Sequence, residues 1–153
     1  MQNKIKYGSI LVTDDDEGDR FLIEKAMRAN GVENEIRFLG DGQALVDHLN
    51  GSLKSTHPND SPDLPCLILL DLNMPLLDGR EALKIVKNHS RLKEIPVVVL
   101  TNSDNPEDIL CSYQEGANSF FTKPLDYLDL VSLMGLLRNY WFQTAQLPSR
   151  QPR

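Results

Sequence analysis

The sequence has no hydrophobic run long enough to cross a membrane, because its longest apolar stretches are Leu67–Leu70 and Val97–Leu100. The amino-terminal segment lacks the apolar core of a signal peptide. Basic residues are also scarce, since 16 lysines and arginines face 22 acids and leave a net charge of −6. We therefore expect no nucleic-acid partner and no membrane partner, and we expect a cytoplasmic location.

Cysteine and histidine are rare as well. Cys66 and Cys111 fall in a predicted strand and a predicted helix, without the spacing of metal ligands. We expect both to be buried free thiols, which suits a reducing compartment. The three histidines, His48, His57 and His89, lie on predicted helices or loops, and we expect them on the surface, away from any site.

What the chain does contain is a buried apolar run that stops at a carboxylate. Leu67–Leu70 ends at Asp71, with Pro65 before it and Pro75 after it. This pattern predicts a strand buried on both faces, although periodicity alone also allows a helix. Asp71 then lies at the carboxyl end of a central parallel strand, where open α/β sheets bind ligands. The alternative is that Asp71 is only the polar end of a strand.

The rest of the chain alternates between strand and helix patterns, and its 153 residues suit one domain. The other predicted strands are 7–13, 35–39, 95–100 and 118–122, and the predicted helices are 20–29, 42–49, 79–86, 106–115 and 126–143. Residues 52–65 are a predicted surface loop. The fold class is α/β: a five-stranded parallel doubly wound sheet of the flavodoxin-like order 2-1-3-4-5.

Two details of the helices are also predicted. Asp16 is expected to cap the first helix, with Asp19 in its first turn, and Asn50–Gly51 is expected to end the second. The helical spacing in the first helix includes five residues: Phe21, Leu22, Lys25, Ala26 and Ala29.

Polar side chains follow the strands that should form the centre and one side of the sheet. In a parallel sheet these strand ends share one edge, which brings together Asp14, Asp15, Asp71, Thr101 and Lys123. Each residue alone is weak evidence, but acids, a hydroxyl and an ammonium together are what a phosphoryl site needs. Mg²⁺ suits such a site better than Ca²⁺ or Zn²⁺, because few protein oxygens and no histidine or cysteine are offered.

These motifs resemble the response-regulator receiver domain of two-component signalling. The resemblance runs from about Ile10 to Leu137 and rests on the acidic pair, Asp71 in Leu-Leu-Asp-Leu-Asn-Met-Pro, Asp78-Gly79, Thr101 and Lys123-Pro124. It implies a receiver domain over residues 1–143, followed by a carboxy-terminal tail over 144–153. It also implies a phosphoacceptor protein rather than an enzyme.

The resemblance assigns a role to each residue. Asp71 would be phosphorylated by a histidine kinase, and Mg²⁺ would be held by Asp15, Asp71 and the Asn73 carbonyl, with Asp14 helping. Lys123 would pair with the phosphoryl group, and its bond to Pro124 is typically cis in the family. Thr101 would move its hydroxyl onto a phosphoryl oxygen. Phe120 would be the aromatic switch, or alternatively a plain core residue. Thr13 departs from the family pattern, which usually has an apolar residue there.

The sequence of the carboxy-terminal helix indicates how the protein would pass on its signal. We expect a stand-alone receiver that signals by contact, through a homodimer of the last helix that uses Leu130, Met134, Leu137 and Trp141. The motivating feature is Tyr140-Trp141-Phe142, which is too apolar to be left in water. This tail is similar to that of small receivers paired with bacterial phytochromes, which suggests a phytochrome-type histidine kinase as partner.

Three alternatives compete with this interpretation. A haloacid-dehalogenase-type Mg-dependent phosphatase would also use a strand-end aspartate, but it needs a second aspartate where this chain has Asn73. A flavin-binding module would need a phosphate-binding loop after the first strand, where acids stand instead. A degenerate receiver would lack one of the required groups, and none is missing.

Overall fold

The computed structural model describes residues 8–54 and 63–148, in which strands and helices alternate as predicted. The elements are β1 (Ile10–Thr13), α1 (Glu17–Ala29), β2 (Ile36–Leu39), α2 (Gly42–Leu53), β3 (Leu67–Leu70), α3 (Gly79–Asn88), β4 (Val97–Thr101), α4 (Pro106–Gln114), β5 (Ser119–Thr122) and α5 (Tyr127–Arg138). A 3₁₀ turn, Leu92–Glu94, precedes β4, and a π-helical turn, Asn139–Thr144, continues α5.

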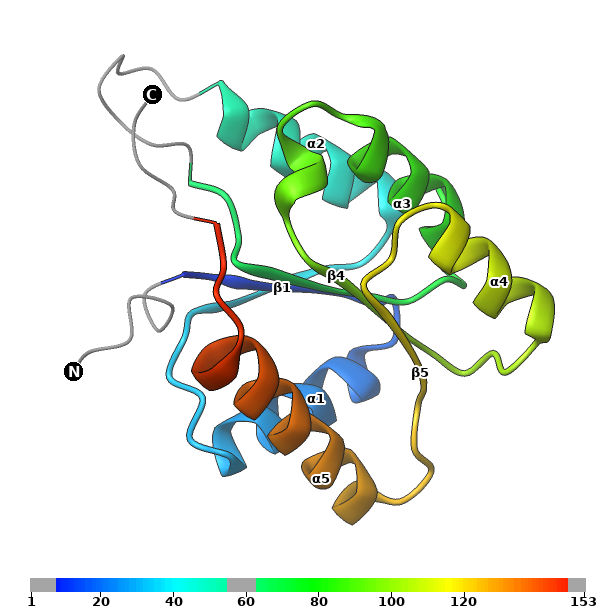
Figure 1. The fold of residues 1–153 in the computed structure, drawn as a ribbon. Coiled ribbons are helices and arrows are strands. Elements are labelled where there is room, and N and C mark those ends of the chain that lie inside the picture. The colour runs from blue at the N-terminus through cyan, green and yellow to red at the C-terminus, as the bar shows by residue number, and fades with distance from the viewer. Residues whose placement is uncertain (1–7, 55–62, 149–153) are drawn as a thin grey trace.

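The strands form one parallel sheet of order β2-β1-β3-β4-β5, which confirms the predicted fold class. Helices α1 and α5 cover one face, and α2, α3 and α4 lie on the other (Figure 1). The three central strands β1, β3 and β4 are buried throughout, whereas the edge strands are half-buried or more exposed. Because every strand runs the same way, all the strand carboxyl ends lie on one edge of the sheet.

Side chains cap the helices that leave this edge. The Asp16 carboxylate accepts from the Asp19 amide at 2.9 Å, and the Asn105 side chain accepts from the Glu107 amide at 2.9 Å. Asp78 caps α3 in the same way. Each such cap stabilises its helix by about 1 kcal/mol. Together they fix where the helices begin, close to the strand ends.

The helical spacing named for α1 does not mark its buried face. Phe21 is 65% exposed, while Ile23, Ala26 and Met27 are buried against the sheet. The two sets overlap at Ala26, and the sheet selects the aliphatic set because it fills the space beside β1 and β3.

The predicted end of α2 was also wrong. The helix continues through Asn50–Gly51 to Leu53, which packs against the core. A glycine in a helix costs only about 1 kcal/mol, and burying Leu53 offsets that.

The last helix packs on its own sheet, which corrects the predicted dimer residues. Leu130, Met134, Leu137 and Trp141 are all 8% exposed or less, in the core that α5 shares with α1. The π-helical turn also places Phe142 in this core, so that two of the three tail aromatics are buried within the chain itself. Four residues needed for the fold are not available to a second molecule.

The cysteines and histidines are only partly as expected. Neither cysteine forms a disulfide within the described residues. Cys66 precedes β3 and is half-buried, whereas Cys111 is exposed on α4, so the expected burial was wrong for Cys111. His48 and His89 are half-buried rather than on the open surface, and the His89 imidazole accepts from the Arg91 and Leu92 amides. His57, Tyr7 and most of the predicted loop fall outside the described residues.

No helix in the part of the chain that the structure describes is long and apolar enough to span a membrane.

Gly79 joins the start of α3 to the end of β3. A Cβ at this position would overlap the carbonyl oxygen of Asp71 and lie 2.7 Å from the Leu72 Cα atom. We expect Gly79→Ala to lower the free energy of unfolding by about 1–3 kcal/mol, because the backbone that carries Asp71 must shift. Urea unfolding measures this change.

Gly51 is the matched control for this substitution. It lies in α2, and a methyl group added there would have nothing within 4 Å. Gly51→Ala should raise stability by about 0.5–1 kcal/mol, because alanine is the better helix former. Equal effects of the two substitutions would contradict the close approach of Gly79 to Asp71.

Candidate phosphoryl site

The strand ends bring the predicted residues together. Asp14 follows β1, Asp71 follows β3, Thr101 ends β4 and Lys123 follows β5. The Lys123 Nζ atom lies 3.1 Å from the Asp71 Oδ2 atom, although the two residues belong to strands on either side of β4. The structure therefore places the acids, the hydroxyl and the ammonium on one edge of the sheet, as the sequence predicted.

Lys123 is shared by three carboxylates. Its ammonium lies 2.7 Å from Asp14, 2.8 Å from Asp19 and 3.1 Å from Asp71, and only 8% of its side chain is exposed. Burial disfavours the ammonium, but the contacts with Asp14 and Asp19 outweigh this and raise the pKa of Lys123. The lysine is therefore a fixed positive charge at neutral pH.

Asp14 is the most buried of the acids, at 2% exposure. Its Oδ1 atom accepts from the Asp16 amide at 2.9 Å, while Oδ2 has the ionic contact with Lys123 but no hydrogen bond of good geometry. Burial raises the pKa of Asp14, although Lys123 and the Asp16 amide act in the opposite direction. The neighbouring lysine stabilises the charged form of this acid, which burial disfavours.

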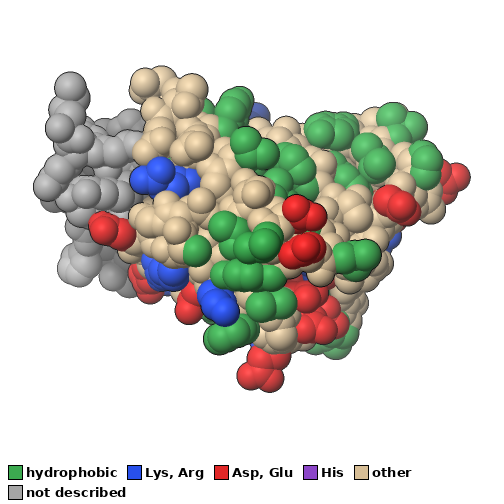
Figure 2. Space-filling view, turned by 90° about the horizontal axis from the view of Figure 1, so that it is seen from below, with side chains coloured by type: hydrophobic (Ala, Val, Ile, Leu, Met, Phe, Trp, Pro, Cys, Tyr) green, Lys and Arg blue, Asp and Glu red, His purple; other side chains and the backbone are tan. Residues whose placement is uncertain are grey.

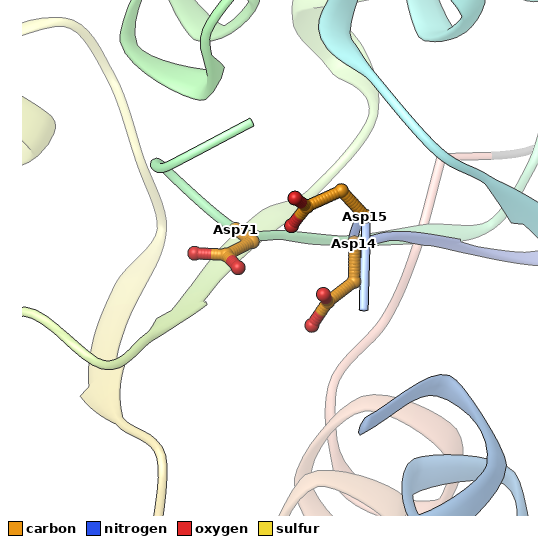
Figure 3. A group of neighbouring side chains, drawn as sticks. All are labelled: Asp14, Asp15 and Asp71. Carbon is orange, nitrogen blue, oxygen red and sulfur yellow. The ribbon is translucent and has the colours of Figure 1, made fainter. Parts of the chain in front are cut away.

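Asp14, Asp15 and Asp71 form a cluster that can hold a metal ion. Each offers a carboxylate oxygen, and these oxygens lie within 4.8 Å of one another. Figure 3 shows Asp14 and Asp15 leaving the end of β1 in opposite directions, with Asp71 beside them at the end of β3. Three neighbouring carboxylates, one of them on the exposed Asp15, offer the hard oxygen ligands that fit a divalent cation.

The other predicted site residues surround this cluster. The Asn73 backbone amide donates to Asp71 Oδ1 at 3.3 Å, which places Asn73 next to Asp71. Thr101 is fully buried, and its hydroxyl oxygen accepts from the Ser103 amide at 3.4 Å. Phe120 is half-buried against the core formed with α2 and α3, so both of its predicted roles stay predictions.

Two local expectations have clear outcomes. The structure has no cis peptide bond among its described residues, so the expected cis bond between Lys123 and Pro124 was wrong. Thr13 takes the place of an apolar residue, and it is 1% exposed with an unbonded hydroxyl. The hydroxyl fits sterically, at the cost of an unsatisfied polar atom.

Sequence reasoning missed two charged residues that border the site. Asp19 was interpreted only as a first-turn acid of α1, yet it binds Lys123. Arg80, at the start of α3, binds Asp108 in α4 and approaches Asn73. The available signal was that both residues lie in the first turn of a helix that begins at the site edge.

The comparisons with known proteins agree with this geometry. Residues 10–134 match the family model of the response regulator receiver domain. Response regulator Rcp1 of Synechocystis sp. is 36% identical over 140 residues, which cover 92% of this chain and 92% of Rcp1. The probable methanogenesis regulatory protein FilR2 of Methanothrix harundinacea is 36% identical over 139 residues, which cover 91% of this chain and 86% of FilR2.

Solved structures show the same likeness. The phosphorylated cyanobacterial phytochrome response regulator RcpA superposes with a TM-score of 0.82 at 36% identity, covering 94% of this chain and 99% of RcpA. The Mn²⁺-bound form of Rcp1 gives a TM-score of 0.78 at 34% identity, covering 93% of this chain and 99% of Rcp1.

Replacing Lys123 should expose the repulsion between the acids. We expect Lys123→Met to lower stability at pH 7 by about 3 kcal/mol, because buried carboxylates lose their cation. Without the lysine the pKa of Asp14 rises further in the folded state. The folded variant then binds protons as the pH falls toward about 5, and it should recover part of its lost stability.

Urea unfolding at about pH 7 and about pH 5 measures both effects, with Lys84→Met as the control. Lys84 is an exposed lysine of α3 outside the site, so its replacement should change little at either pH. A deficit in Lys123→Met that is the same at both pH values would contradict the proposed balance of charge.

Proposed function

The chain belongs to the response regulator receiver family, and from this premise we propose that Asp71 accepts a phosphoryl group from a histidine kinase. The observation that carries the proposal is the 3.1 Å contact between the Lys123 ammonium and the Asp71 carboxylate beside two further acids. An Asp71 oxygen would attack the phosphorus of a phosphohistidine, so that a P–O bond forms and the P–N bond breaks. The chain acts as a phosphoacceptor in signalling rather than as an enzyme.

The surrounding residues would make this transfer possible. Asp14, Asp15, Asp71 and the Asn73 carbonyl would hold Mg²⁺, whose charge offsets the repulsion between the acids and the incoming phosphoryl group. Lys123 would pair with a phosphoryl oxygen. The Thr101 hydroxyl would turn to donate to another, and Phe120 would follow it inward as a switch. Mg²⁺ is proposed here because the donor set is all oxygen.

We further propose that the kinase is of the phytochrome type. The support comes from RcpA, a phytochrome response regulator that the chain resembles over 94% of its length. The proposal includes a cytoplasmic location and no contact with nucleic acid, in line with the acidic net charge of −6.

The phosphatase alternative finds no support. Asn73 occupies the position where such an enzyme needs its acid, and its side-chain oxygen accepts from Arg80 at 3.4 Å. An amide there cannot give a proton to a leaving group.

Labelling with acetyl phosphate and Mg²⁺ tests the assignment of Asp71. We expect one acid-labile phosphate per chain on the unaltered protein and none on Asp71→Asn, because an amide oxygen is not a competent acceptor. The control is Asp104→Asn, which removes an exposed acid from the turn after β4 and should label normally. Equal labelling of Asp71→Asn would refute the assignment, and continuous release of phosphate over many turnovers would favour a phosphatase.

A homodimer through α5 remains part of the proposal, with a different set of contacts. Three large apolar residues of the helix and its continuation point outward: Leu128 at 71% exposure, Leu136 at 64% and Tyr140 at 57%. Figure 2 shows the face of α1 and α5, where hydrophobic side chains gather between acidic groups. Phe21 of α1 and Leu125 before α5 are also exposed. A patch of this kind is typical of a protein–protein contact.

Light scattering at micromolar concentration, with and without phosphorylation, tests this contact. We expect a dimer that Leu136→Glu converts to a monomer, because a charge would be buried at the interface. The control is Leu110→Glu, an equally exposed leucine on α4, on the opposite side of the sheet from the α1–α5 layer. A monomer of the unaltered chain in both states would exclude the homodimer.

A further inference from the structure

A bidentate ion pair joins α3 to α4 beside the site. The Arg80 Nε atom donates to Asp108 Oδ1 at 2.8 Å, and Nη2 donates to Oδ2 at 2.9 Å. The Asp108 side chain is 16% exposed and that of Arg80 is 37% exposed. Paired hydrogen bonds of this geometry are stronger and more directional than a single ionic contact. None of the roles proposed above uses this pair.

Ser103 connects the ion pair to Thr101. Its hydroxyl donates to Asp108 Oδ2 at 2.6 Å, and its amide donates to the Thr101 hydroxyl oxygen at 3.4 Å. Its carbonyl accepts from the Thr122 hydroxyl at 3.3 Å. Since the amide contact is long and weak, the position of Ser103 depends mainly on its short bond to Asp108. We call Arg80, Asp108 and Ser103 the Arg80 latch.

The other side of the guanidinium faces the loop after β3. Its Nη1 atom lies 3.4 Å from the Asn73 side-chain oxygen and 3.6 Å from Asp78. One side chain therefore contacts both segments that flank Asp71: the β3–α3 loop, which carries Asn73, and, through Asp108, the β4–α4 turn, which carries Ser103. A residue in this position can influence the site without touching the reacting atoms.

We propose that Arg80 is a positioning residue that holds the site in its unphosphorylated arrangement, an inference that rests on the proposed function. Through Asp108 and Ser103 it keeps the Thr101 hydroxyl in contact with the Ser103 amide. The hydroxyl keeps its own proton in that contact, but no hydrogen bond joins Thr101 to Asp71 among the described residues. To reach a phosphoryl oxygen on Asp71 the side chain would therefore turn, which draws its oxygen away from the Ser103 amide and moves the β4–α4 turn. The latch therefore stabilises the state without the phosphoryl group, and by linkage it weakens binding of that group.

Binding of beryllium trifluoride, a mimic of the phosphoryl group, tests the latch at equilibrium. Calorimetry with Mg²⁺ should show that Arg80→Gln and Asp108→Asn each lower the Kd at least about fivefold. The double variant should gain no more than the single ones, because both substitutions break the same latch. Amide hydrogen exchange at Ser103, measured without the mimic, should be faster in Arg80→Gln.

The control is Arg37→Gln, which removes an ion pair with Glu35 and Asp63 at β2, the edge strand that β1 and β3 separate from β4. It should leave the Kd unchanged. An unchanged or raised Kd in Arg80→Gln, or additive effects in the double variant, would overturn the latch while leaving the phosphoacceptor role intact. If the unaltered chain does not bind the mimic, both proposals fail.

Discussion

The site depends on one buried ammonium shared among three carboxylates. Lys123 lies within 3.1 Å of Asp14, Asp19 and Asp71, and two of these acids are almost fully buried. Two like charges about 4 Å apart repel by about 4 kcal/mol at the effective dielectric of a protein surface, which is a large part of a domain's total stability. The acids can coexist at this edge because a cation lies among them. A bound metal ion would add to that effect without replacing it.

The parallel sheet creates the conditions for this interaction. Lys123 and Asp14 come from opposite ends of the sequence, and they meet because β1 and β5 end on the same edge. The same rule applies to the helices that leave the edge, whose first turns lie beside the strand ends. Asp19 and Arg80 therefore border the site for the same topological reason as Asp71. The close approach of Gly79 to the Asp71 carbonyl then fixes α3 against the end of β3.

The sequence could predict which residues lie at the strand ends, but not which long side chains touch each other there. Which residues lie at a strand end follows from the pattern of apolar runs, so Asp14, Asp71, Thr101 and Lys123 could be placed at one edge without coordinates. Contacts made by long side chains follow from rotamers and from the path of a turn, which no periodicity encodes. Hence the Asp19 and Arg80 contacts were missed.

The same limit applies to surfaces. The α1 pattern included two competing faces, and only the space beside the sheet selects the face that carries Ile23. The α5 helix is apolar on more than one side. Its sequence therefore predicts an excess of hydrophobic surface, but not which of these residues are buried in the core of the domain. The structure uses the stripe through Met134 for its own core and leaves Leu136 outside. More apolar residues on a helix than its own core needs therefore indicate a contact with another molecule, but they do not identify the residues that make it.

Two side chains around Asp71 also suggest how one modification could reach two faces of the molecule. Lys123 contacts both Asp71 and Asp19 of α1, and Thr101 is linked through Ser103 to Asp108 of α4. These helices lie on opposite faces of the sheet (Figure 1). A phosphoryl group on Asp71 would change the partners of both Lys123 and Thr101, because each would turn toward the new oxygens. The added charge would thus alter contacts on the α1–α5 side and on the α4 side at once, each through its own chain of hydrogen bonds. An output surface on either side could then respond without a large movement of the sheet between them.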